Sequence, residues 1–361
     1  MAIWHINGGN RLEGACFVQG SKNAVLPILA ASIVCPTETE LMNVPCLSDV
    51  DASLSILRQL GCTAVREDND VYIDSRSISS NVIPRSMMEC MRSSVLFMGA
   101  LLARCGEVHL TAPGGCKLGA RPIDMHISAM KALGAEGKEC GCEIVCRAQR
   151  LKGARIALPY PSVGATENAM IAACAAEGET VITGAAREPE IEDLQEYLRK
   201  AGAYVSGAGT ADITISGFDA DSHIGHRIMP DRIAAATFLC AAAAAGGDIE
   251  LRDVDFRHFY RLQHFLKQAG CDIIASNRSL RLVSDGKLGS VGRVETGPYP
   301  EFPTDMQPLL MAALLKASGK TDFVENVFDS RFGHTRELAR FGADISVEGR
   351  CAEVWGVREL T

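Results

Sequence analysis

The chain has 361 residues, of which 47% are hydrophobic, and this length is sufficient for two compact domains with separate cores. Its 36 Lys and Arg against 44 Asp and Glu give a net charge of -8, which argues against general attraction to nucleic acid or anionic membranes. The longest apolar runs are too short to span a bilayer, and the N-terminus lacks the features of a signal peptide. We therefore expect a globular, cytoplasmic protein without membrane insertion that holds any anionic ligand in a local site.

A helix that ends in glycine followed by Ala or Cys recurs along the chain. The glycines of this pattern are Gly61, Gly134, Gly202, Gly270 and Gly342. Successive glycines are 68 to 73 residues apart, a period typical of internal structural repeats. Glycine at this place suits a left-handed C-cap, so we expect a positive φ at each one.

Each repeat contains further elements in the same order. In chain order, the expected first helix and the strand after it lie at 24–32 and 40–44, 95–103 and 107–111, 169–176 and 180–184, 236–244 and 248–252, and 309–317 and 322–326. A second helix and two strands follow, which makes the unit β-α-β-α-β-β, written five times, with a stray strand before the first. The fold class is therefore α/β, built from repeats, and we expect the alanine-rich first helices to be buried on all sides.

Polar residues stand just before these first helices, at equivalent places in the repeats. They are Lys22 and Asn23, Arg92, Ser162 and Gly164, Asp231 and Arg232, and Asp305. Helix N-termini carry free N–H groups that favour anions, so this set suits phosphate or carboxylate groups. The alternative is that Asp231, Thr304 and Asp305 are ordinary N-caps and the basic residues are solvated; the repeat alone leaves both interpretations open.

The segment Pro113 to His126, PGGCKLGARPIDMH, predicts a loop of special geometry before a helix. Cys116 lies in its middle, beside Lys117 and near Arg121, and cationic neighbours lower the pKa of a thiol and make it reactive. Cys116 is therefore a candidate functional thiol. His126, on the helix that follows, is expected to be structural.

Other chemistries find little support. The fourteen cysteines are scattered through a long chain, which indicates reduced, mostly buried thiols. CGCEIVC, at 140–146, predicts one strand with its cysteines on one face, and no histidine cluster completes a zinc site there. GAGTAD, at 207–212, lacks the third glycine of a dinucleotide fingerprint and is expected in a hairpin. No Ser-His-Asp order or H-E-x-x-H motif suggests a hydrolase.

Seven segments together resemble the UDP-N-acetylglucosamine enolpyruvyl transferase family. They are GSKNAVLPILAAS, PGGCKLGARPIDMHISAMKALGA, PSVGATENAMIAA, AAREPEIEDL, MPDRIAAATFL, FPTDMQPL and VFDSRFGH, in family order across nearly the whole chain. The G-N-A-G-T-x-x-R loop of the related 3-phosphoshikimate transferases is absent. The resemblance implies a two-domain enolpyruvyl transferase fold, an inside-out α/β barrel. Its first domain would be residues 20–226, and its second domain would be residues 1–19 with 227–361.

The resemblance also implies roles for residues on the phosphoenolpyruvate side. Lys22 is similar to the lysine that binds the phosphate, with Asn23 alongside. Cys116 is similar to the general acid that adds covalently to phosphoenolpyruvate and is alkylated by fosfomycin. Arg121 matches an arginine that faces the phosphate.

Further matches concern the UDP-sugar. Asp305 is similar to the carboxylate that takes the proton of the sugar 3-hydroxyl. The remaining matches to UDP-sugar contacts are Arg92, Arg121, Pro122, Ile123, Asp124, Met125, Ser162, Val163, Gly164 and Val327, with Arg331 as a conformational or active-site arginine. The implied reaction transfers enolpyruvyl from phosphoenolpyruvate to UDP-N-acetylglucosamine with release of phosphate, the first committed step of peptidoglycan synthesis, and needs no metal or organic cofactor.

The chain departs from the family pattern in a few places. Tyr160 stands where some members have lysine, and Ala234 replaces an expected acidic residue. The sequence ends at VWGVRELT, where the family continues into a sixth repeat that carries two active-site arginines, so we expect weaker substrate binding, and the sequence leaves the activity of this form open. A UDP-sugar-binding paralogue that regulates without turnover is the alternative function.

Overall fold

The computed structural model describes residues 5–111, 123–140, 143–218 and 223–361. The chain divides into two compact units, and each is described by itself. Unit 1 comprises Met1–Val18 and Pro230–Thr361, and unit 2 comprises Gln19–Met229. The chain therefore passes from one unit to the other twice.

Unit 2 contains three of the sequence repeats. Its helices are α1 (Lys22–Ala31), α2 (Ser48–Gln59), α3 (Arg85–Met88), η1 (Arg92–Leu96), α4 (Phe97–Cys105), α5 (Asp124–Ala132), α6 (Val163–Ala173) and α7 (Pro189–Lys200). Its strands are β2 (Glu38–Met42), β3 (Thr63–Glu67), β4 (Asp70–Asp74), β5 (Glu107–Thr111), β6 (Glu136–Cys140), β7 (Glu143–Arg147), β8 (Arg155–Ala157), β9 (Glu179–Thr183), β10 (Ala203–Ser206), β11 (Asp212–Phe218) and β12 (His223–Arg227).

Unit 1 contains the remaining two repeats. Its helices are α8 (Arg232–Ala245), η2 (Phe256–Phe259), α9 (Tyr260–Gln268), α10 (Gln307–Ala313), η3 (Leu314–Lys316), η4 (Arg331–His334) and α11 (Thr335–Arg340). Its strands are β1 (Leu12–Phe17), β13 (Gly247–Arg252), β14 (Asp272–Ser276), β15 (Ser279–Ser284), β16 (Gly292–Glu295), β17 (Lys320–Val324), β18 (Asp344–Glu348) and β19 (Cys351–Trp355).

Each repeat forms a small sheet, which is mixed in four repeats and antiparallel in the second, β5-β7-β6. In unit 2 the strand orders are β12-β2-β4-β3, β5-β7-β6 and β10-β11-β9-β8, and in unit 1 they are β1-β13-β15-β14 and β16-β17-β19-β18. Four strands that precede first helices, β1, β8, β12 and β16, pair in parallel with strands that follow first helices, whereas the other pairs of these strands and their neighbours are antiparallel. A parallel pair needs a crossover, which the first helix supplies in the third repeat (α6, between β8 and β9) and in the fifth repeat (α10, between β16 and β17).

The first and fourth repeats exchange their initial strands. β1 precedes α1 of unit 2 but pairs with β13 of unit 1, and β12 precedes α8 of unit 1 but pairs with β2 of unit 2. The two connecting segments lie beside each other at the edge of unit 2, where Ser21 N donates to Met229 O at 2.8 Å. This exchange explains why each unit is completed by a strand from the other part of the chain.

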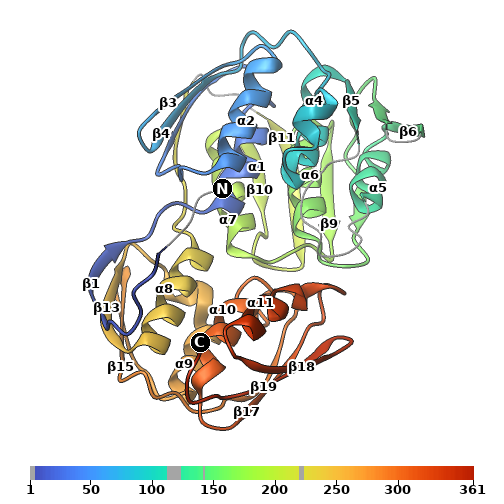
Figure 1. The fold of residues 1–361 in the computed structure, drawn as a ribbon. Helices are drawn as coiled ribbons and strands as arrows, with labels where there is room; N and C mark the ends of the chain where they lie inside the picture. The colour runs from blue at the N-terminus through green and yellow to red at the C-terminus, as the bar shows by residue number, and fades with distance from the viewer. Residues whose placement is uncertain (1–4, 112–122, 141–142, 219–222) are drawn as a thin grey trace. The chain divides into compact units, whose positions relative to one another are not determined.

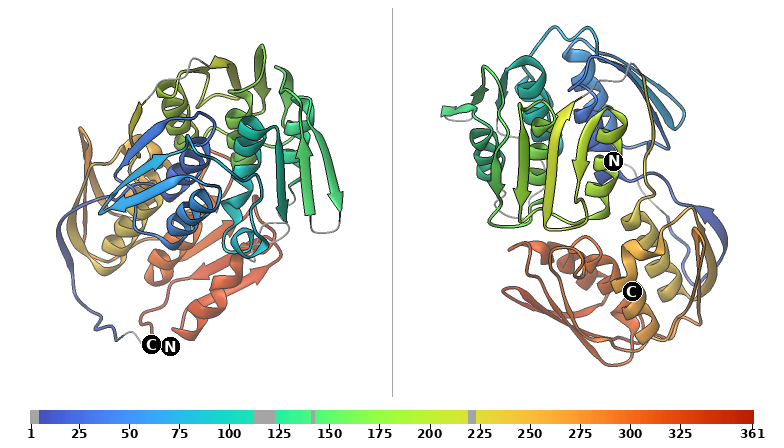
Figure 2. Two further views of the ribbon diagram at one scale, coloured as in Figure 1. Left: turned by 90° about the horizontal axis from the view of Figure 1, so that it is seen from above. Right: turned by 180° about the vertical axis from the view of Figure 1, so that it is seen from behind.

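The first helices of unit 2 pack together and the sheets lie around them. α4 packs against α1 and α6, which also contact each other, and the eight residues from Ala24 to Ala31 of α1 are buried (Figure 1). Strands such as β9 alternate between buried side chains and side chains that are half-buried or exposed, so their sheets have one solvent face. The right-hand view of Figure 2 shows β9 and β11 side by side along this face. This is the inside-out arrangement that was expected.

The expectation of complete burial is wrong for α8. Phe238 is 46% exposed, and Thr237 and Ala241 are exposed as well. Within the described residues of unit 1, α8 packs against α10, without a third first helix of the kind that unit 2 has. One stripe of α8 therefore remains uncovered.

The repeat glycines behave as expected. Each follows a second helix of its repeat with a positive φ, from 85° at Gly342 to 107° at Gly270. Residues with a Cβ rarely adopt this conformation, so glycine ends the helix at little cost. GAGTAD lies as expected between β10 and β11.

The prediction that CGCEIVC forms one strand is wrong. Cys140 ends β6, Glu143 begins β7, and Cys142 lies outside the described residues. Ile144 and Cys146 do share the buried face of β7. Of the cysteines whose side chains the structure describes, all eleven are free: six are buried, four are exposed and Cys16 is half-buried. Across the described part of the chain, every helix is too short or too polar for a membrane crossing.

Candidate active site

Lys22 and Asn23 begin α1. Ser21 caps this helix, its Oγ accepting from Ala24 N at 3.3 Å, which fixes where the helix starts. The Lys22 ammonium lies 3.3 Å from Asp49 Oδ2 in the first turn of α2, with 44% of the Lys22 side chain exposed. Such a half-exposed ion pair contributes little to stability. The ammonium can therefore turn from Asp49 to an incoming anion at low cost.

Arg92 begins η1, which packs against α1 and α6. Its cation is near enough to His126 of α5 to affect that ring. Burial, and secondly the Arg92 charge, lower the pKa of His126 to about 4, whereas Asp124 opposes this shift. His126 is therefore neutral near pH 7. It is buried, as expected for a structural residue, and lies between predicted site residues.

The segment Ser162 to Gly164 begins α6. Ser162 is the N-cap, and its Oγ accepts from Ala165 N at 3.4 Å. A Cβ on Gly164 would lie 3.2 Å from His126 Cε1, so the backbone of this turn approaches the imidazole closely. Tyr160, one of the departures from the family pattern, is 41% exposed.

Part of the predicted site cannot be placed. Cys116, Arg121 and Pro122 lie outside the described residues. Ile123 occupies the N-cap position of α5, and Asp124 and Met125 form its first turn. The structure thus brings η1 and the starts of α5 and α6 together around His126.

Asp305 and Arg331 form the centre of the predicted site residues in unit 1. Arg331 Nη2 donates to Asp305 Oδ1 at 2.9 Å and to Thr304 O at 3.1 Å. The guanidinium is mostly buried, with 12% of the Arg331 side chain exposed against 43% for Asp305. Asp305 Oδ2 has no hydrogen-bond partner among the described residues. The arginine therefore orients the carboxylate and leaves one oxygen open to a ligand.

Glu325 is a site residue that the sequence analysis missed. It is fully buried, accepts from the Thr304 hydroxyl at 3.1 and 3.0 Å, and accepts from Val327 N at 2.9 Å and Phe328 N at 3.0 Å. It thereby ties the Val327 segment to the segment that carries Asp305. The available signal was a glutamate near the end of the expected strand 322–326 of the fifth repeat.

The residues before α8 and α10 test the N-cap interpretation. Asp231 is an N-cap, accepting from Ile233 N at 2.8 Å and Ala234 N at 3.0 Å. Thr304 and Asp305 are not, because α10 begins only at Gln307, and their side chains bond to Glu325 and Arg331 instead. Arg232 is not solvated as the alternative assumed: it is 5% exposed and lies over the Tyr299 ring at 5.7 Å.

A second missed residue is Glu167, one turn into α6. It is buried, and burial together with the neighbouring carboxylates of Glu190 and Glu188 raises its pKa well above the usual value. Glu190 is also buried, in the first turn of α7. Burial and the neighbouring carboxylates therefore both favour the neutral form of the Glu167 carboxyl inside unit 2.

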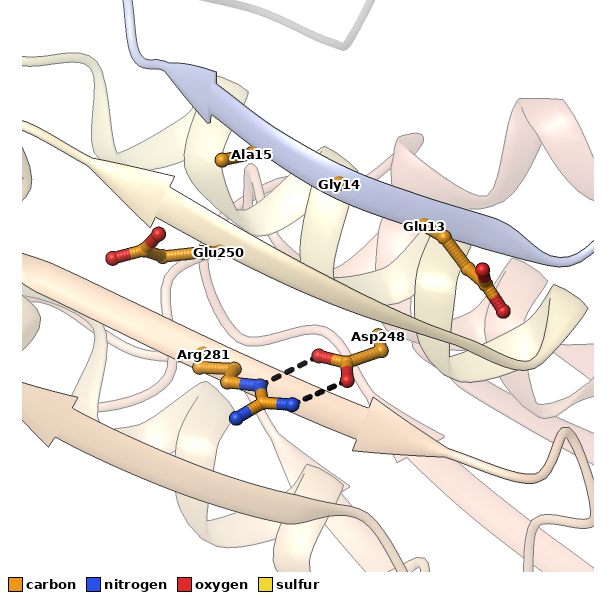
Figure 3. A pocket seen from close by; sticks show the side chains of 6 residues that line it. All are labelled: Glu13, Gly14, Ala15, Asp248, Glu250 and Arg281. Atoms are coloured by element: carbon orange, nitrogen blue, oxygen red, sulfur yellow. Dashed lines mark hydrogen bonds and ion pairs between the residues drawn. The ribbon is translucent and has the colours of Figure 1, made fainter.

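A hollow on unit 1 lies apart from the predicted residues of that unit. It is formed on the solvent face of the sheet β1-β13-β15-β14 by Glu13, Asp248, Glu250 and Arg281, with Gly14 and Ala15 (Figure 3). Arg281 Nε donates to Asp248 Oδ1 at 2.7 Å. The hollow is open and its lining carries three carboxylates against one guanidinium, which does not suit an anionic ligand, so it is a weaker candidate than the Asp305–Arg331 pair.

Comparison with known proteins agrees with this picture. The EPSP synthase family (3-phosphoshikimate 1-carboxyvinyltransferase) matches residues 6–359. The chain is 44% identical to UDP-N-acetylglucosamine 1-carboxyvinyltransferase 2 of Caldanaerobacter subterraneus subsp. tengcongensis, over 100% of this chain and 87% of the relative. It is 44% identical to UDP-N-acetylglucosamine 1-carboxyvinyltransferase of Geotalea uraniireducens, over 99% of this chain and 85% of the relative.

Solved structures show the same fold. The enolpyruvyl transferase NikO of Streptomyces tendae superposes with a TM-score of 0.85 at 22% identity, covering 97% of this chain and 83% of NikO. EPSP synthase of Acinetobacter baumannii reaches a TM-score of 0.71 at 21% identity over the same shares. At such identities the likeness concerns the fold, while the relatives at 44% identity carry the family assignment. The chain therefore belongs to the EPSP synthase family and, within it, to the UDP-N-acetylglucosamine 1-carboxyvinyltransferases.

Proposed function

We propose that this chain transfers the enolpyruvyl group of phosphoenolpyruvate to the 3-hydroxyl of UDP-N-acetylglucosamine and releases inorganic phosphate. The observation that carries the proposal is the 44% identity to UDP-N-acetylglucosamine 1-carboxyvinyltransferases along the whole chain. The chain would act in the cytoplasm, at the first committed step of peptidoglycan synthesis.

In unit 2, the proposed ligand groups are anionic. Lys22 would bind the phosphate of phosphoenolpyruvate, with Asn23 beside it, and its exchangeable pair with Asp49 supports this role. Arg92 would bind the UDP-sugar. The remaining proposed nucleotide contacts of this unit are Ile123, Asp124, Met125, Ser162, Val163 and Gly164, together with Arg121 and Pro122.

In unit 1, Asp305 would be the base for the sugar hydroxyl. Its carboxylate is oriented by Arg331 through Oδ1, and Oδ2 remains for the hydroxyl proton. A general base must lie within hydrogen-bond reach of its proton in a fixed orientation, which is what such a pair provides. Val327, tied in place by Glu325, would contact the nucleotide.

The reaction that these roles serve has two steps. In the addition, the 3-hydroxyl oxygen bonds to C2 of phosphoenolpyruvate, its proton passes to Asp305, and Cys116 delivers a proton to C3. In the elimination, C3 returns a proton to the Cys116 thiolate, the bond from C2 to the phosphate oxygen breaks with its electron pair leaving on inorganic phosphate, and the double bond re-forms. Lys22 would stabilise the charge on the leaving phosphate, since a preorganised cation lowers the barrier where negative charge develops.

The experiment is a substrate comparison with the purified chain. Phosphoenolpyruvate is offered with UDP-N-acetylglucosamine or with 3-phosphoshikimate, while phosphate release and product mass are measured. We expect phosphate and enolpyruvyl-UDP-N-acetylglucosamine with the first acceptor only. Turnover with 3-phosphoshikimate would overturn the acceptor assignment, and UDP-sugar binding without any phosphate release would favour the regulatory alternative.

A further inference from the structure

Asn168 of α6 makes a set of buried hydrogen bonds at the centre of unit 2. Its side chain is fully buried. The amide nitrogen Nδ2 donates to Val95 O at 2.9 Å and lies 2.9 Å from His126 Nδ1, and Oδ1 accepts from Gly99 N at 2.6 Å. A primary amide has two donor hydrogens, so both are used, along with its acceptor.

This network fixes the orientation of the amide. Oδ1 must face the Gly99 N–H, and Nδ2 must face the Val95 carbonyl, because a flipped amide would oppose donor to donor and acceptor to acceptor. Nδ2 can therefore only donate to His126. It follows that His126 Nδ1 is an acceptor and that the proton of the neutral imidazole is on Nε2.

The protonated edge of His126 lies against the predicted nucleotide segment. Its Nε2 is 3.5 Å from the place where a Cβ on Gly164 would be. Arg92 of η1 and Asp124 of α5 are the charged groups that act on the ring. A neutral ring with an N–H at Nε2 adds a donor beside Gly164 without a second positive charge next to Arg92.

Asn168 also joins the elements that carry those residues. Val95 belongs to η1, which begins at Arg92, Gly99 belongs to α4, and His126 belongs to α5. One amide in the middle of α6 therefore connects this helix to η1, α4 and the first turn of α5. A buried donor or acceptor left without its partner is unfavourable, so this arrangement resists small displacements.

We propose that Asn168 is a positioning residue for UDP-sugar binding, which holds His126 as the Nε2–H tautomer and fixes Arg92 and Ser162–Gly164 relative to each other. This role rests on the proposed function for the identity of the ligand. The tautomer itself does not depend on it. Binding of phosphoenolpyruvate, whose phosphate is assigned to Lys22, should depend on Asn168 much less.

The test combines spectroscopy with binding. Nitrogen-15 resonances of His126, assigned with an H126Q variant, report the tautomer directly, and calorimetry with UDP-N-acetylglucosamine reports affinity. We expect the Nε2–H tautomer in the wild type. Asn168→Asp, which is isosteric but lacks both donors, should draw a proton to Nδ1 and weaken UDP-N-acetylglucosamine binding by about tenfold or more. Asn277→Asp, in an exposed turn of unit 1, is the matched control and should change neither quantity.

Two substitutions of the histidine separate positioning from packing. His126→Gln retains a donor near the place of Nε2, and His126→Asn retains only a group near Nδ1. We expect His126→Gln to bind UDP-N-acetylglucosamine more tightly than His126→Asn does. An Nδ1–H tautomer in the wild type, or Asn168→Asp binding UDP-N-acetylglucosamine like the wild type, would overturn the proposal.

Failure of the two proposals can be told apart. A wild type that binds UDP-N-acetylglucosamine without releasing phosphate overturns the transferase function, while the tautomer and the affinity loss still decide the role of Asn168. A wild type that does not bind UDP-N-acetylglucosamine overturns both proposals.

Discussion

Arg331 holds Asp305 by a hydrogen bond of 2.9 Å from Nη2 to Oδ1 and holds the preceding carbonyl of Thr304 at 3.1 Å. The same guanidinium is largely buried, and its Nε has no hydrogen-bond partner among the described residues. The pair is thus oriented from the protein side and open on the Asp305 Oδ2 side. Because charge-assisted bonds are strong and directional, this geometry is suited to a base that must meet one hydroxyl.

Replacement of Asp305 by Asn should remove the base and keep its shape. We expect kcat to fall by about 10²-fold or more with little change in KM for UDP-N-acetylglucosamine, since general base catalysis contributes at this scale. Steady-state phosphate release measures both constants. Asp329→Asn, at an exposed carboxylate paired with Arg350, is the control and should leave kcat unchanged. A D305N variant with normal kcat would exclude Asp305 as the base.

Replacement of Lys22 by Met should act on phosphoenolpyruvate. Loss of a charged hydrogen-bond donor to phosphate costs about 1.5–3 kcal/mol, so KM for phosphoenolpyruvate should rise roughly 10- to 100-fold. Lys22→Arg retains the charge and should be milder. Binding of UDP-N-acetylglucosamine, followed by calorimetry, should hardly change, and Lys287→Met at an exposed site serves as the control. An equal loss for both substrates would contradict a phosphate-specific role.

Glu325 should matter for stability and for the Val327 segment. Glu325→Ala leaves the Thr304 hydroxyl and the amides of Val327 and Phe328 without their acceptor, so the free energy of unfolding should fall by roughly 2–4 kcal/mol. Glu325→Gln keeps one acceptor oxygen and should lose less. Urea unfolding measures both variants, with Glu348→Ala on exposed β18 as the control. Equal stability of the Ala and Gln variants would argue against this hydrogen-bonding role.

Glu167 predicts a pH dependence of stability. Burial, Glu190 and Glu188 raise the pKa of Glu167 in the folded state. The contribution of Glu167 to the free energy of unfolding is therefore fully present below the pKa of the unfolded state, and it is lost as the pH rises through the pKa of the folded state. Glu167→Gln should therefore raise Tm near neutral pH, and the gain should vanish at acidic pH. Thermal unfolding across pH measures this difference, with exposed Glu143→Gln as the control. A gain that does not depend on pH would point to packing instead.

Fosfomycin should label Cys116 alone. The exposed cysteines Cys46, Cys90, Cys105 and Cys351 are internal controls, which a general thiol reagent should modify. Selectivity is expected because the basic residues beside Cys116 favour its thiolate, whereas burial raises the pKa of Cys105. Peptide mass mapping locates the adduct, and Cys116→Ser should abolish it. Adducts on the exposed control cysteines would contradict a selective site.

The repeat architecture could be predicted from the sequence because its signals are local. The helix periodicity and the glycine that ends each second helix depend on neighbouring residues, and the positive φ at Gly61 or Gly270 follows from sterics alone. The family segments likewise gave the fold and the proposed chemistry. Of the proposed site residues, the structure leaves Cys116, Arg121 and Pro122 undescribed.

Other features were decided only by the tertiary structure. The exchange of β1 and β12 pairs strands that are far apart in the chain. The hydrogen bonds between Arg331 and Asp305 and between Asn168 and His126 likewise join different elements. The exposed stripe of α8 also depends on which helices pack against it. Local propensity made Thr304 and Asp305 plausible N-caps, yet their side chains form hydrogen bonds with Glu325 and Arg331 instead. The sequence by itself determined which elements form and which chemical groups they carry; long-range packing determined their partners, because burial and hydrogen bonding act between whatever surfaces the fold brings together.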